Sequence, residues 1–429
     1  MKSKLRLTVG MVLGVAAMGA YADTSVWSEF RGSARDGTSA ATGLPLTWSE
    51  TENIKWKTEL PGIGHSSPVV ANGRIWLTHC PDKGKSQHVL CVDFETGKIL
   101  RDIKLFSYDS TKELYHNMNS HATPTPIVEG NRVYVTFGNP GTACLNAETG
   151  EVIWQRTDIT NQYFDVGAAS CPTLYGNKII IQCDGQPNAA RFVIALDKNT
   201  GETLWRTDRT YPNNEVPGYT HASCMPLLVK VGDKEQLISP GAHGVRSYDV
   251  ETGEELWVAR YGGWSVVPRP VTDGKLVFIC AGVVREAMMA IRLDQAKGDI
   301  TGTDAIAWST TTKRIIPDMP SPLLINNRFY TLAAGRLNCL DPATGNEIWS
   351  ANIPKQHLAS PVVCGEGRAY LFNVEGGATI VELGDTFKQL ASNQLDVSGG
   401  LLYASPAIVG KSLIVRTSTH LYRIEDAGK

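Results

Sequence analysis

The sequence predicts an all-β protein, an eight-bladed β-propeller of four-stranded antiparallel blades whose ring is closed by a strand near the N-terminus. Three observations carry this prediction: a repeated start motif, a repeated turn motif, and a mismatch between the two ends of the chain. The 41 glycines among 429 residues indicate many tight turns. No stretch shows the periodicity of a helix longer than one turn.

The start motif is a dipeptide that ends in proline and precedes a short apolar strand. A hairpin turn such as Asn72-Gly73 follows. The next strand alternates as a half-buried strand does, with Val133, Val135 and Phe137 on one face. The starts are Ser67-Pro68, Thr125-Pro126, Cys171-Pro172, Met225-Pro226, Arg269-Pro270, Ser321-Pro322, Ser360-Pro361 and Ser405-Pro406. Eight starts predict eight blades.

The turn motif is Leu-Asp-x-x-Thr-Gly-x-x-x-Trp, which we place between the third and fourth strands of a blade. Glycine accepts the positive φ of such a turn, while the aspartate and threonine can hydrogen-bond its backbone. The tryptophan falls on the outer strand and should wedge against the next blade. Examples are residues 146–150 with Trp154, 197–201 with Trp205, 249–253 with Trp257, and 341–345 with Trp349. Two blades depart from the motif: the first has Leu100 in place of the tryptophan, and the seventh has Leu383-Gly384-Asp385.

The two ends of the chain complement each other. The last repeat, from Ser405, has room for only three strands, whereas residues 51–57 form a lone fourth strand ahead of the first repeat. We therefore expect the early strand to complete the last blade and remove the free edges of the array. This makes residues 51–429 one propeller domain and residues 23–50 an N-terminal extension. The residues Phe30-Arg31-Gly32 and Arg35-Asp36 in that extension are expected toward the opposite face or the outer rim, away from the channel, as an Arg/Asp clasp on the closure.

The first 22 residues have the three parts of a secretory signal peptide. Lys2, Lys4 and Arg6 precede an apolar run over residues 7–18, and small residues end at Ala22. A retained membrane anchor is the alternative, but the run is shorter than the ~20 residues that span a bilayer. We expect cleavage near Ala22 and a secreted protein, periplasmic or extracellular, with no transmembrane segment in the mature chain.

Charge and cysteine content limit the partners. Without residues 1–22 the chain has 38 basic and 43 acidic side chains and no basic run, which argues against nucleic acid as a partner. We expect a monomer. The nine cysteines are an odd number. Cys80 with Cys91, and Cys171 with Cys183, flank loops and could form disulfides; the alternative is that they are small buried apolar side chains.

Two sets of loops should emerge on one face of the propeller, around the central channel: the connections between blades, and the loops between second and third strands. This funnel face is the expected binding face. His65, His121, His221 and His357 stand just before repeat starts, and Trp264 occupies the same connection in the fifth blade. Such imidazoles could bind a metal, an anionic ligand or an acidic partner, depending on pH. The alternative is that each caps a strand end, because four of them are too far apart for one ion.

The loops between second and third strands add further polar candidates. They are Asn139, Asp184, His243, Arg285, Glu286, Arg336, Glu375 and His420. The alternative for each is ordinary solvated surface. Two long connections, residues 106–122 with Tyr108, Tyr115 and His116, and residues 207–222 with Tyr211 and Tyr219, favour recognition of a sugar, a quinone or a protein side chain; packing of the loops on one another is the alternative.

The two motifs together resemble the pyrroloquinoline-quinone-like (quinoprotein-type) propeller repeat. This repeat is shared by bacterial quinoprotein alcohol dehydrogenases and by the noncatalytic outer-membrane assembly lipoprotein. The resemblance extends from residues 27–32 to residues 419–424. It implies a fold but no activity.

In the dehydrogenases of this kind, the quinone lies between a tryptophan and a disulfide of adjacent cysteines. Carboxylate and amide oxygens hold calcium there, and an aspartate is the base. The resemblance thus implies the quinone (PQQ) and calcium as candidate cofactors, with Trp264 as the floor and Asp184, Glu286 or Glu375 as calcium ligands. No motif assigns these residues, and the chain has no Cys-Cys dipeptide. It also lacks the lipid-attachment cysteine of the assembly lipoprotein.

Three functions follow as hypotheses. The first is a noncatalytic scaffold of the cell envelope that binds an envelope protein, or a small-molecule or carbohydrate ligand, through the funnel face. The second is a PQQ-dependent dehydrogenase acting on alcohols or sugars. A carbohydrate-acting enzyme that uses funnel histidines, tyrosines and carboxylates for proton transfer is a third.

Overall fold

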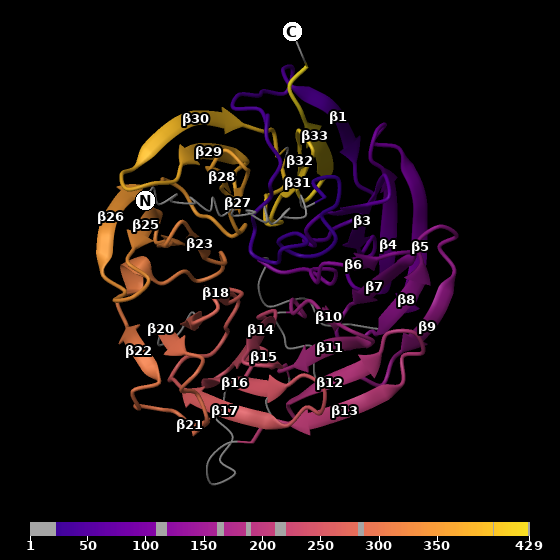
Figure 1. Ribbon diagram of the computed structural model, residues 1–429. Helices are drawn as coiled ribbons and strands as arrows, with labels where there is room; N and C mark the ends of the chain where they lie inside the picture. The colour runs from indigo at the N-terminus through magenta and orange to yellow at the C-terminus, as the bar shows by residue number, and fades with distance from the viewer. Residues whose placement is uncertain are drawn as a thin grey trace, which may run out of the picture.

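The computed structural model describes residues 23–108, 118–160, 167–185, 190–210, 220–281, 287–397 and 399–427. These residues form eight sheets arranged as a ring (Figure 1), which confirms the predicted propeller. Their only helical element is the 3-10 turn η2 (Lys313–Ile315), and none of them belongs to a helix that could cross a membrane. Several predictions of the sequence lie outside the described residues, namely the signal peptide, Tyr115, His116, Tyr211, Tyr219, Arg285 and Glu286.

Each blade runs along the sequence from its inner to its outer strand. Blade 1 is β2 (Val69–Ala71), β3 (Arg74–His79), β4 (Ser86–Asp93) and β5 (Ile99–Ser107). Blade 2 is β6 (Ile127–Glu129), β7 (Arg132–Thr136), β8 (Thr142–Asn146) and β9 (Val152–Arg156). Blade 3 is β10 (Thr173–Tyr175), β11 (Lys178–Cys183), β12 (Phe192–Asp197) and β13 (Thr203–Asp208). Blade 4 is β14 (Leu227–Val231), β15 (Lys234–Gly241), β16 (Gly244–Asp249) and β17 (Glu255–Arg260).

The second half of the ring repeats this order. Blade 5 is β18 (Val271–Thr272), β19 (Leu276–Ala281), β20 (Ala287–Arg292) and β22 (Ile306–Thr310). Blade 6 is β23 (Leu323–Ile325), β24 (Arg328–Ala333), β25 (Arg336–Leu340) and β26 (Glu347–Asn352). Blade 7 is β27 (Val362–Val363), β28 (Arg368–Phe372), β29 (Gly377–Glu382) and β30 (Lys388–Gln394). Blade 8 contains β31 (Ala407–Val409), β32 (Ser412–Arg416) and β33 (His420–Ile424).

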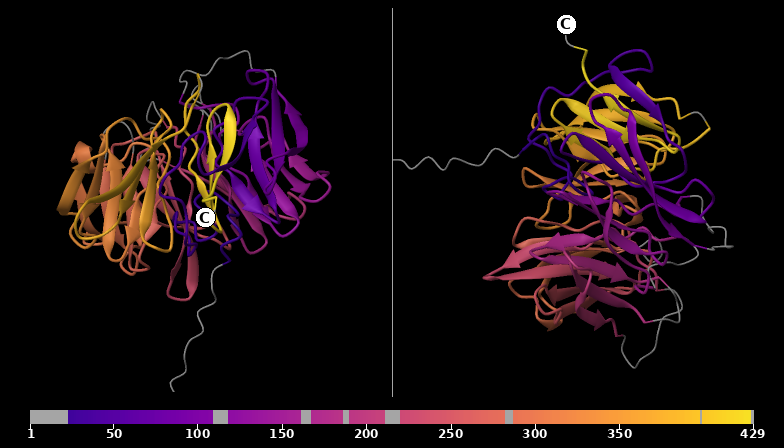
Figure 2. Two further views of the ribbon diagram at one scale, coloured as in Figure 1. Left: turned by 90° about the horizontal axis from the view of Figure 1, so that it is seen from above. Right: turned by 90° about the vertical axis from the view of Figure 1, so that its right-hand side faces the viewer.

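The last blade is completed by the early strand, as the sequence predicts. Strand β1 (Ile54–Glu59) pairs antiparallel with β33, with Lys57 opposite Tyr422. The indigo strand and the yellow strand lie side by side in Figure 1, and Figure 2 shows them in the same sector of the ring. The pairing closes the ring and covers the edge of β33 with a fourth strand. One blade departs from four strands: β21 (Gly298–Asp299), from the fifth repeat, adds to the outer edge of β17 in parallel.

Most residues that precede the prolines of the start motif are small and polar, because their side chains accept hydrogen bonds from the neighbouring blade. The backbone N–H of Ser321 donates to the Ser360 hydroxyl over 2.9 Å. Ser360 N–H donates to the Ser405 hydroxyl over 2.8 Å, and Ser405 N–H to the Ser67 hydroxyl over 3.1 Å. The same link joins Ser67 to Thr125, Thr125 to the Cys171 sulfur, and Arg269 to Ser321. Hydroxyl groups therefore bind neighbouring blades together around the channel, where buried N–H groups need acceptors.

Most tryptophans of the turn motif also join blades through their N–H, as predicted, whereas the Trp257 N–H donates to Gln236 of its own blade over 3.2 Å. The Trp154 Nε1–H donates to the Lys198 carbonyl of the next blade over 3.0 Å. A Cβ built on Gly201, whose φ is +77°, would lie 2.8 Å from the Trp154 ring. The equivalent bonds run from Trp56 to Phe94, from Trp205 to Val250, from Trp308 to Pro342, and from Trp349 to Gly384. Glycine is thus required in the turn both for its φ and for the close approach of the ring.

We expect Gly201→Ala to lower the free energy of unfolding by about 2–4 kcal/mol, because it adds a steric clash to a strained φ. Gly176→Ala is the matched control, since Gly176 has a φ of +53° but no atom near a built Cβ. It should cost only about 1 kcal/mol, the strain alone. Urea unfolding of the two variants measures the difference, and equal losses would contradict the role given to the Trp154 contact.

The extension before β1 fills the centre of the ring, which corrects the expectation that it lies away from the channel. We call residues 23–44 the plug segment. It begins and ends at the turns between first and second strands, on the side opposite the funnel face, where the Gly410 N–H donates to Thr24 and the Gly365 N–H to Ala41. Between these points it reaches the inner strands: Trp27 pairs with Val70. Further backbone and side-chain bonds join it to Val128, Leu174, Arg269, Ser321 and Val363. Seven of the eight blades therefore share one segment at their centre.

Two charged residues of the plug segment, Glu29 and Arg31, are buried in the channel. Arg31 is 1% exposed, and it donates to the backbone carbonyls of Ser321 (3.1 Å) and Pro322 (2.7 Å). Glu29 pairs with Arg35 over 2.8 Å and lies 3.9 Å from the Arg269 guanidinium. The predicted Arg/Asp clasp takes a different form: Arg31 donates to the Asp36 backbone carbonyl, and Arg35 binds Glu29. The prediction that this segment lies away from the channel was based on the order of strands in the repeat. The segment turns inward instead, because its apolar and arginine side chains have their partners at the centre of the ring.

Candidate functional site

The predicted rim residues all lie in connections that lead from the outer strand of one blade to the inner strand of the next. His65, His121, His221 and His357 precede β2, β6, β14 and β27, and Trp264 precedes β18. They are distributed around the funnel face rather than gathered. Only His221 and Trp264 meet, with ring centroids 5.0 Å apart in an edge-to-face arrangement. His65 instead packs against Tyr403 at 4.4 Å.

Burial keeps the rim histidines neutral. It lowers the pKa of His65 to about 3, with a further contribution from the nearby Arg416 cation. It lowers the pKa of His221 and of His357 to about 4, and it also lowers the pKa of His121. At neutral pH these imidazoles therefore offer an N–H donor and a lone pair, and they bring no positive charge to the funnel.

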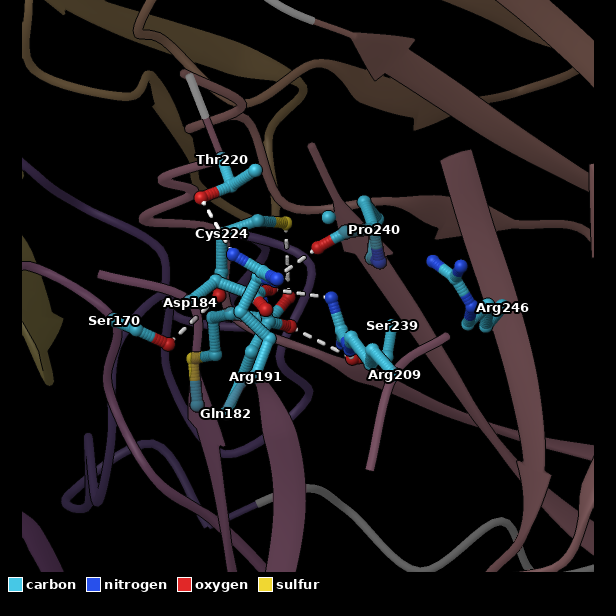
Figure 3. A network of polar contacts seen from close by, with 12 residues as sticks. Ser170, Gln182, Asp184, Arg191, Arg209, Thr220, Cys224, Ser239, Pro240 and Arg246 are labelled. Carbon is cyan, nitrogen blue, oxygen red and sulfur yellow. Dashed lines mark hydrogen bonds and ion pairs between the residues drawn. The ribbon is translucent and has the colours of Figure 1, made fainter. Parts of the chain in front are cut away.

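Asp184, nominated as a calcium ligand, is the centre of a buried ion-pair network between blades 3 and 4 (Figure 3). Its carboxylate pairs with Arg209, and both side chains are 1% exposed. Gln182 donates a second hydrogen bond to it over 2.9 Å. Burial raises the pKa of Asp184, against the opposing effect of the Arg209, Arg246 and Arg191 cations.

The arginines of this network reach the funnel side from three strands or strand ends. Arg191 donates to the Thr220 hydroxyl over 3.1 Å. Arg246 pairs with Glu255 over 3.1 Å, and Arg209 also donates to the Ser239 hydroxyl. The guanidinium of Arg209 occupies the space where a Cβ of Gly241 would be, 2.0 Å away. The network therefore fixes the interface of two blades and engages the Asp184 Oδ2, while Oδ1 is buried without a hydrogen-bond partner among the described residues.

The other nominated residues also have structural contacts. Asn139 and His243 are half-buried at turns between second and third strands, and the His243 N–H donates to Gly263 over 2.7 Å. Arg336 donates to the Ser350 hydroxyl over 2.7 Å and to the Asn352 amide oxygen over 2.6 Å. Glu375 is exposed and pairs with Lys355 over 2.9 Å. These side chains do not converge on one point.

A cavity of about 280 Å³ opens on the funnel face between blades 6 and 7. Its walls are mainly apolar, and His357 contributes the imidazole that the sequence nominates. It is lined by Met118, Asp318, Met319, Pro320, residues 332–335, Gln356, His357 and Leu358. Met118 comes from the connection between blades 1 and 2, and it remains 37% exposed. We call this cavity the funnel pocket.

Sequence reasoning missed a buried arginine beside the rim. Arg416, the last residue of β32, is 1% exposed and donates to the carbonyl and the hydroxyl of Ser66, at 3.1 and 2.6 Å. Burial lowers its pKa to about 9. An arginine within an otherwise apolar strand, as in Arg416 and Arg246, was the available signal, since such a residue is rarely fully buried unless paired.

The structure supports the interpretation of the cysteines as small buried apolar side chains. All nine are buried free thiols. The pairs Cys80–Cys91 and Cys171–Cys183 are not bonded, and Cys91 lies opposite Trp76 within the sheet instead.

The comparisons with known proteins agree with this architecture. The profile of the PQQ_2 family, described as outer membrane protein assembly factor BamB, matches residues 85–309 and 189–428. The chain is 22% identical over 263 residues to a tetrathionate hydrolase from Acidithiobacillus ferrooxidans, covering 58% of this chain and 49% of that protein. It is 30% identical over 156 residues to methanol dehydrogenase (cytochrome c) subunit 1 of Methylobacterium organophilum, covering 33% and 24%. The chain thus spans about half or less of the length of these curated relatives.

Solved structures resemble the whole ring. A europium-containing methanol dehydrogenase superposes with a TM-score of 0.66 at 12% identity, covering 92% of this chain and 90% of that one. The quinohemoprotein alcohol dehydrogenase from Comamonas testosteroni gives 0.66 at 12% identity, covering 95% and 82%. Identity this low shows the fold alone. Because the family profile matches most of the sequence and the fold is the same eight-bladed ring, this chain belongs to the PQQ-like propeller family described as outer membrane protein assembly factor BamB.

Proposed function

We propose that the protein is a noncatalytic binding propeller whose funnel face holds an apolar group of a partner in the funnel pocket. The observation that supports this most is the contrast between the pocket and the rest of the face. The nominated carboxylates Asp184 and Glu375 are engaged by Arg209 and Lys355, whereas Met319 and Leu358 line an accessible apolar cavity. Exposed apolar surface rimmed by polar groups is typical of interaction sites.

The size and composition of the pocket indicate its occupant. Its 280 Å³ is at the lower end of the roughly 300–1,000 Å³ of small-molecule sites. The occupant is therefore an apolar side chain of an envelope protein or the apolar part of a small ligand. The neutral imidazole of His357 beside it supplies one hydrogen bond for orientation. Secretion and location in the cell envelope remain part of the proposal.

The described residues do not fit a quinone with calcium. Calcium prefers six to eight oxygen ligands, yet the Asp184 carboxylate is buried against Arg209 and Glu375 is exposed on a different blade. Trp264 meets His221 edge to face. The free thiols offer no disulfide of adjacent cysteines.

A PQQ-dependent dehydrogenase remains the second candidate function, because the matched relatives include methanol dehydrogenases. Titration of the purified protein with PQQ and Ca²⁺ separates the two functions. We expect no change in the melting temperature. If PQQ binds, an excess of 100 times its Kd should add about 2.7 kcal/mol to the unfolding free energy, and that result would overturn the scaffold proposal.

Charge placed in the funnel pocket tests the binding role directly. We expect Leu358→Glu to lower capture of a specific partner from an extract of the source organism at least about tenfold, since burying an unpaired charge is costly. Leu100→Glu is the matched control, because Leu100 is 42% exposed on an outer strand. Equal capture by both variants would exclude the pocket as the contact.

A further inference from the structure

A cluster of two histidines and one aspartate lies in blade 1, outside the funnel pocket. The Asp102 Oδ1 is 2.8 Å from His79 Nε2 and 2.8 Å from His88 Nδ1. The three ligand atoms lie within 4.8 Å of one another, and no other such group of three His, Cys, Asp or Glu side chains occurs among the described residues. The side chain of His79 is 1% exposed, that of His88 15% and that of Asp102 37%. The cluster is thus anchored in the interior and open to solvent on the Asp102 side.

Strand register brings the three residues together. His79 ends β3 and stands directly opposite His88 on β4, so their side chains share one face of the sheet. Asp102 on β5 is opposite Leu90, two residues from His88 on the same strand. Its carboxylate is therefore the diagonal neighbour of the His88 ring. Three paired strands hold the ligand atoms, which makes the site more rigid than one built on a loop.

The surroundings of His88 are those of a metal-binding imidazole. While Nδ1 faces the cluster, Nε2 is 3.0 Å from the Ser86 hydroxyl. That hydroxyl donates to the Asp82 carboxylate over 2.7 Å, and Asp82 also accepts the Ser86 N–H over 2.7 Å. An imidazole that binds metal through one nitrogen commonly donates its other N–H to such an acceptor, which fixes the tautomer. The chain from His88 through Ser86 to Asp82 provides this arrangement.

The local charges permit a cation. Asp102 carries a negative charge in the cluster, and Asp82 adds a second through Ser86. Arg416, on the neighbouring blade, contributes opposing positive charge and lowers the pKa of His79, although burial is the larger cause of that shift. Burial alone would raise the pKa of Asp102, but the bonds from His79 and His88 hold it below its usual value. The carboxylate offers the cation a negatively charged ligand, and a metal would replace the proton on the ligand nitrogen of each imidazole.

We propose that His79, His88 and Asp102 bind a divalent transition-metal cation such as Zn²⁺, with solvent at the remaining position. Two nitrogens and one carboxylate oxygen suit zinc, which binds nitrogen at about 2.0–2.1 Å in a tetrahedron. Ligand atoms in that geometry are roughly 3.3 Å apart, about half an ångström more than the present 2.8 Å between the Asp102 Oδ1 and each imidazole nitrogen. Three protein ligands with one open position is the arrangement of zinc sites that bind water or substrate. The imidazoles exclude calcium as the preferred ion, because it takes oxygen ligands.

Metal titration of the full-length mature protein, first dialysed against a chelator, tests the site. We expect one equivalent of Zn²⁺ to bind and Ca²⁺ not to compete. Co²⁺ bound in its place should give the visible absorption of a low-symmetry, four- or five-coordinate ion. Asp102→Asn and His88→Gln, both at partly exposed positions, should weaken Zn²⁺ binding at least about 100-fold while the protein stays folded. Ser86→Ala should weaken it about tenfold, through the lost orientation of His88.

Asp299→Asn is the matched control, because Asp299 is also a partly exposed carboxylate beside a basic group, Arg260, at 3.1 Å. It should leave Zn²⁺ binding unchanged. Binding that is absent in the wild type, or equal in wild type and Asp102→Asn, would overturn the assignment. The result is independent of the funnel pocket, since neither outcome depends on a partner or on a quinone.

Discussion

Arg209→Met should lower the free energy of unfolding by about 3–5 kcal/mol at neutral pH, because it leaves the Asp184 carboxylate buried without its main cation. Both side chains are 1% exposed, so water cannot replace the guanidinium. Gln182 would retain one hydrogen bond to the carboxylate, at 2.9 Å. Urea unfolding monitored by tryptophan fluorescence measures the loss.

The loss in Arg209→Met should depend on pH. Burial already raises the pKa of Asp184, and removal of the nearest cation raises it further. A group whose folded pKa exceeds its unfolded value contributes stability below the unfolded pKa and loses it as the pH rises through the folded pKa. The variant should therefore be least stable at neutral and alkaline pH and should recover as the pH falls through the raised pKa.

Two further variants complete this experiment. Asp184→Asn in the Arg209→Met background should restore part of the stability, because the unpaired charge is gone. Lys355→Met breaks the half-exposed pair with Glu375 at 2.9 Å and should cost less than about 1 kcal/mol. A loss in Arg209→Met that is the same at every pH would show that packing, and not charge, is responsible.

Trp27→Ala should also cost about 3–5 kcal/mol, the range for truncating a buried tryptophan. Trp27 is 2% exposed and belongs to the hydrophobic cluster that includes Leu44 and Val70. Its backbone pairs with Val70 through two bonds of 2.8 Å. Loss of the ring should loosen the plug segment, so limited proteolysis should cut within residues 23–44 faster than in the wild type.

Trp27→Phe separates packing from hydrogen bonding. The Trp27 Nε1 is buried and has no hydrogen-bond partner among the described residues. Phenylalanine removes that nitrogen and keeps most of the apolar contact, so it should cost less than about 1.5 kcal/mol. Equal losses in the two variants would mean that the plug segment is held by a polar contact of the indole.

The repeat made the fold predictable. The start motif, the Thr-Gly turn and the tryptophan each serve a contact that recurs between blades, so a single sequence shows the same constraint many times. The fourth strand of blade 8 could also be predicted, because the last repeat has room for only three strands and one extra strand precedes the first repeat. The plug segment could not be found in this way, because it occurs once, and backbone carbonyls that accept from Arg31 and Arg35 belong to blades that are distant in sequence.

The site was predictable only as a surface. The rim positions of His65, His121, His221, His357 and Trp264 follow from the repeat. The burial of the four histidines and the resulting fall in their pKa do not follow from the repeat, because burial depends on neighbouring blades. Asp184 reads as a solvent-facing loop residue in the sequence, yet it is enclosed by arginines from two blades. The His79–His88–Asp102 cluster required the register of three strands, which the sequence alone does not give to within one residue.

Closure by β1 has a consequence for synthesis. Contacts at the seam join positions as far apart as Glu50 and Tyr422, 372 residues along the chain. Domains generally fold as the chain emerges from the ribosome, N-terminal part first, but β1 cannot dock until β33 has been made. Strand β1 must therefore wait, exposed to other partners, while the blades between β1 and β33 are made. Completion of the ring is therefore the step at which a chaperone or a truncation would have the greatest influence.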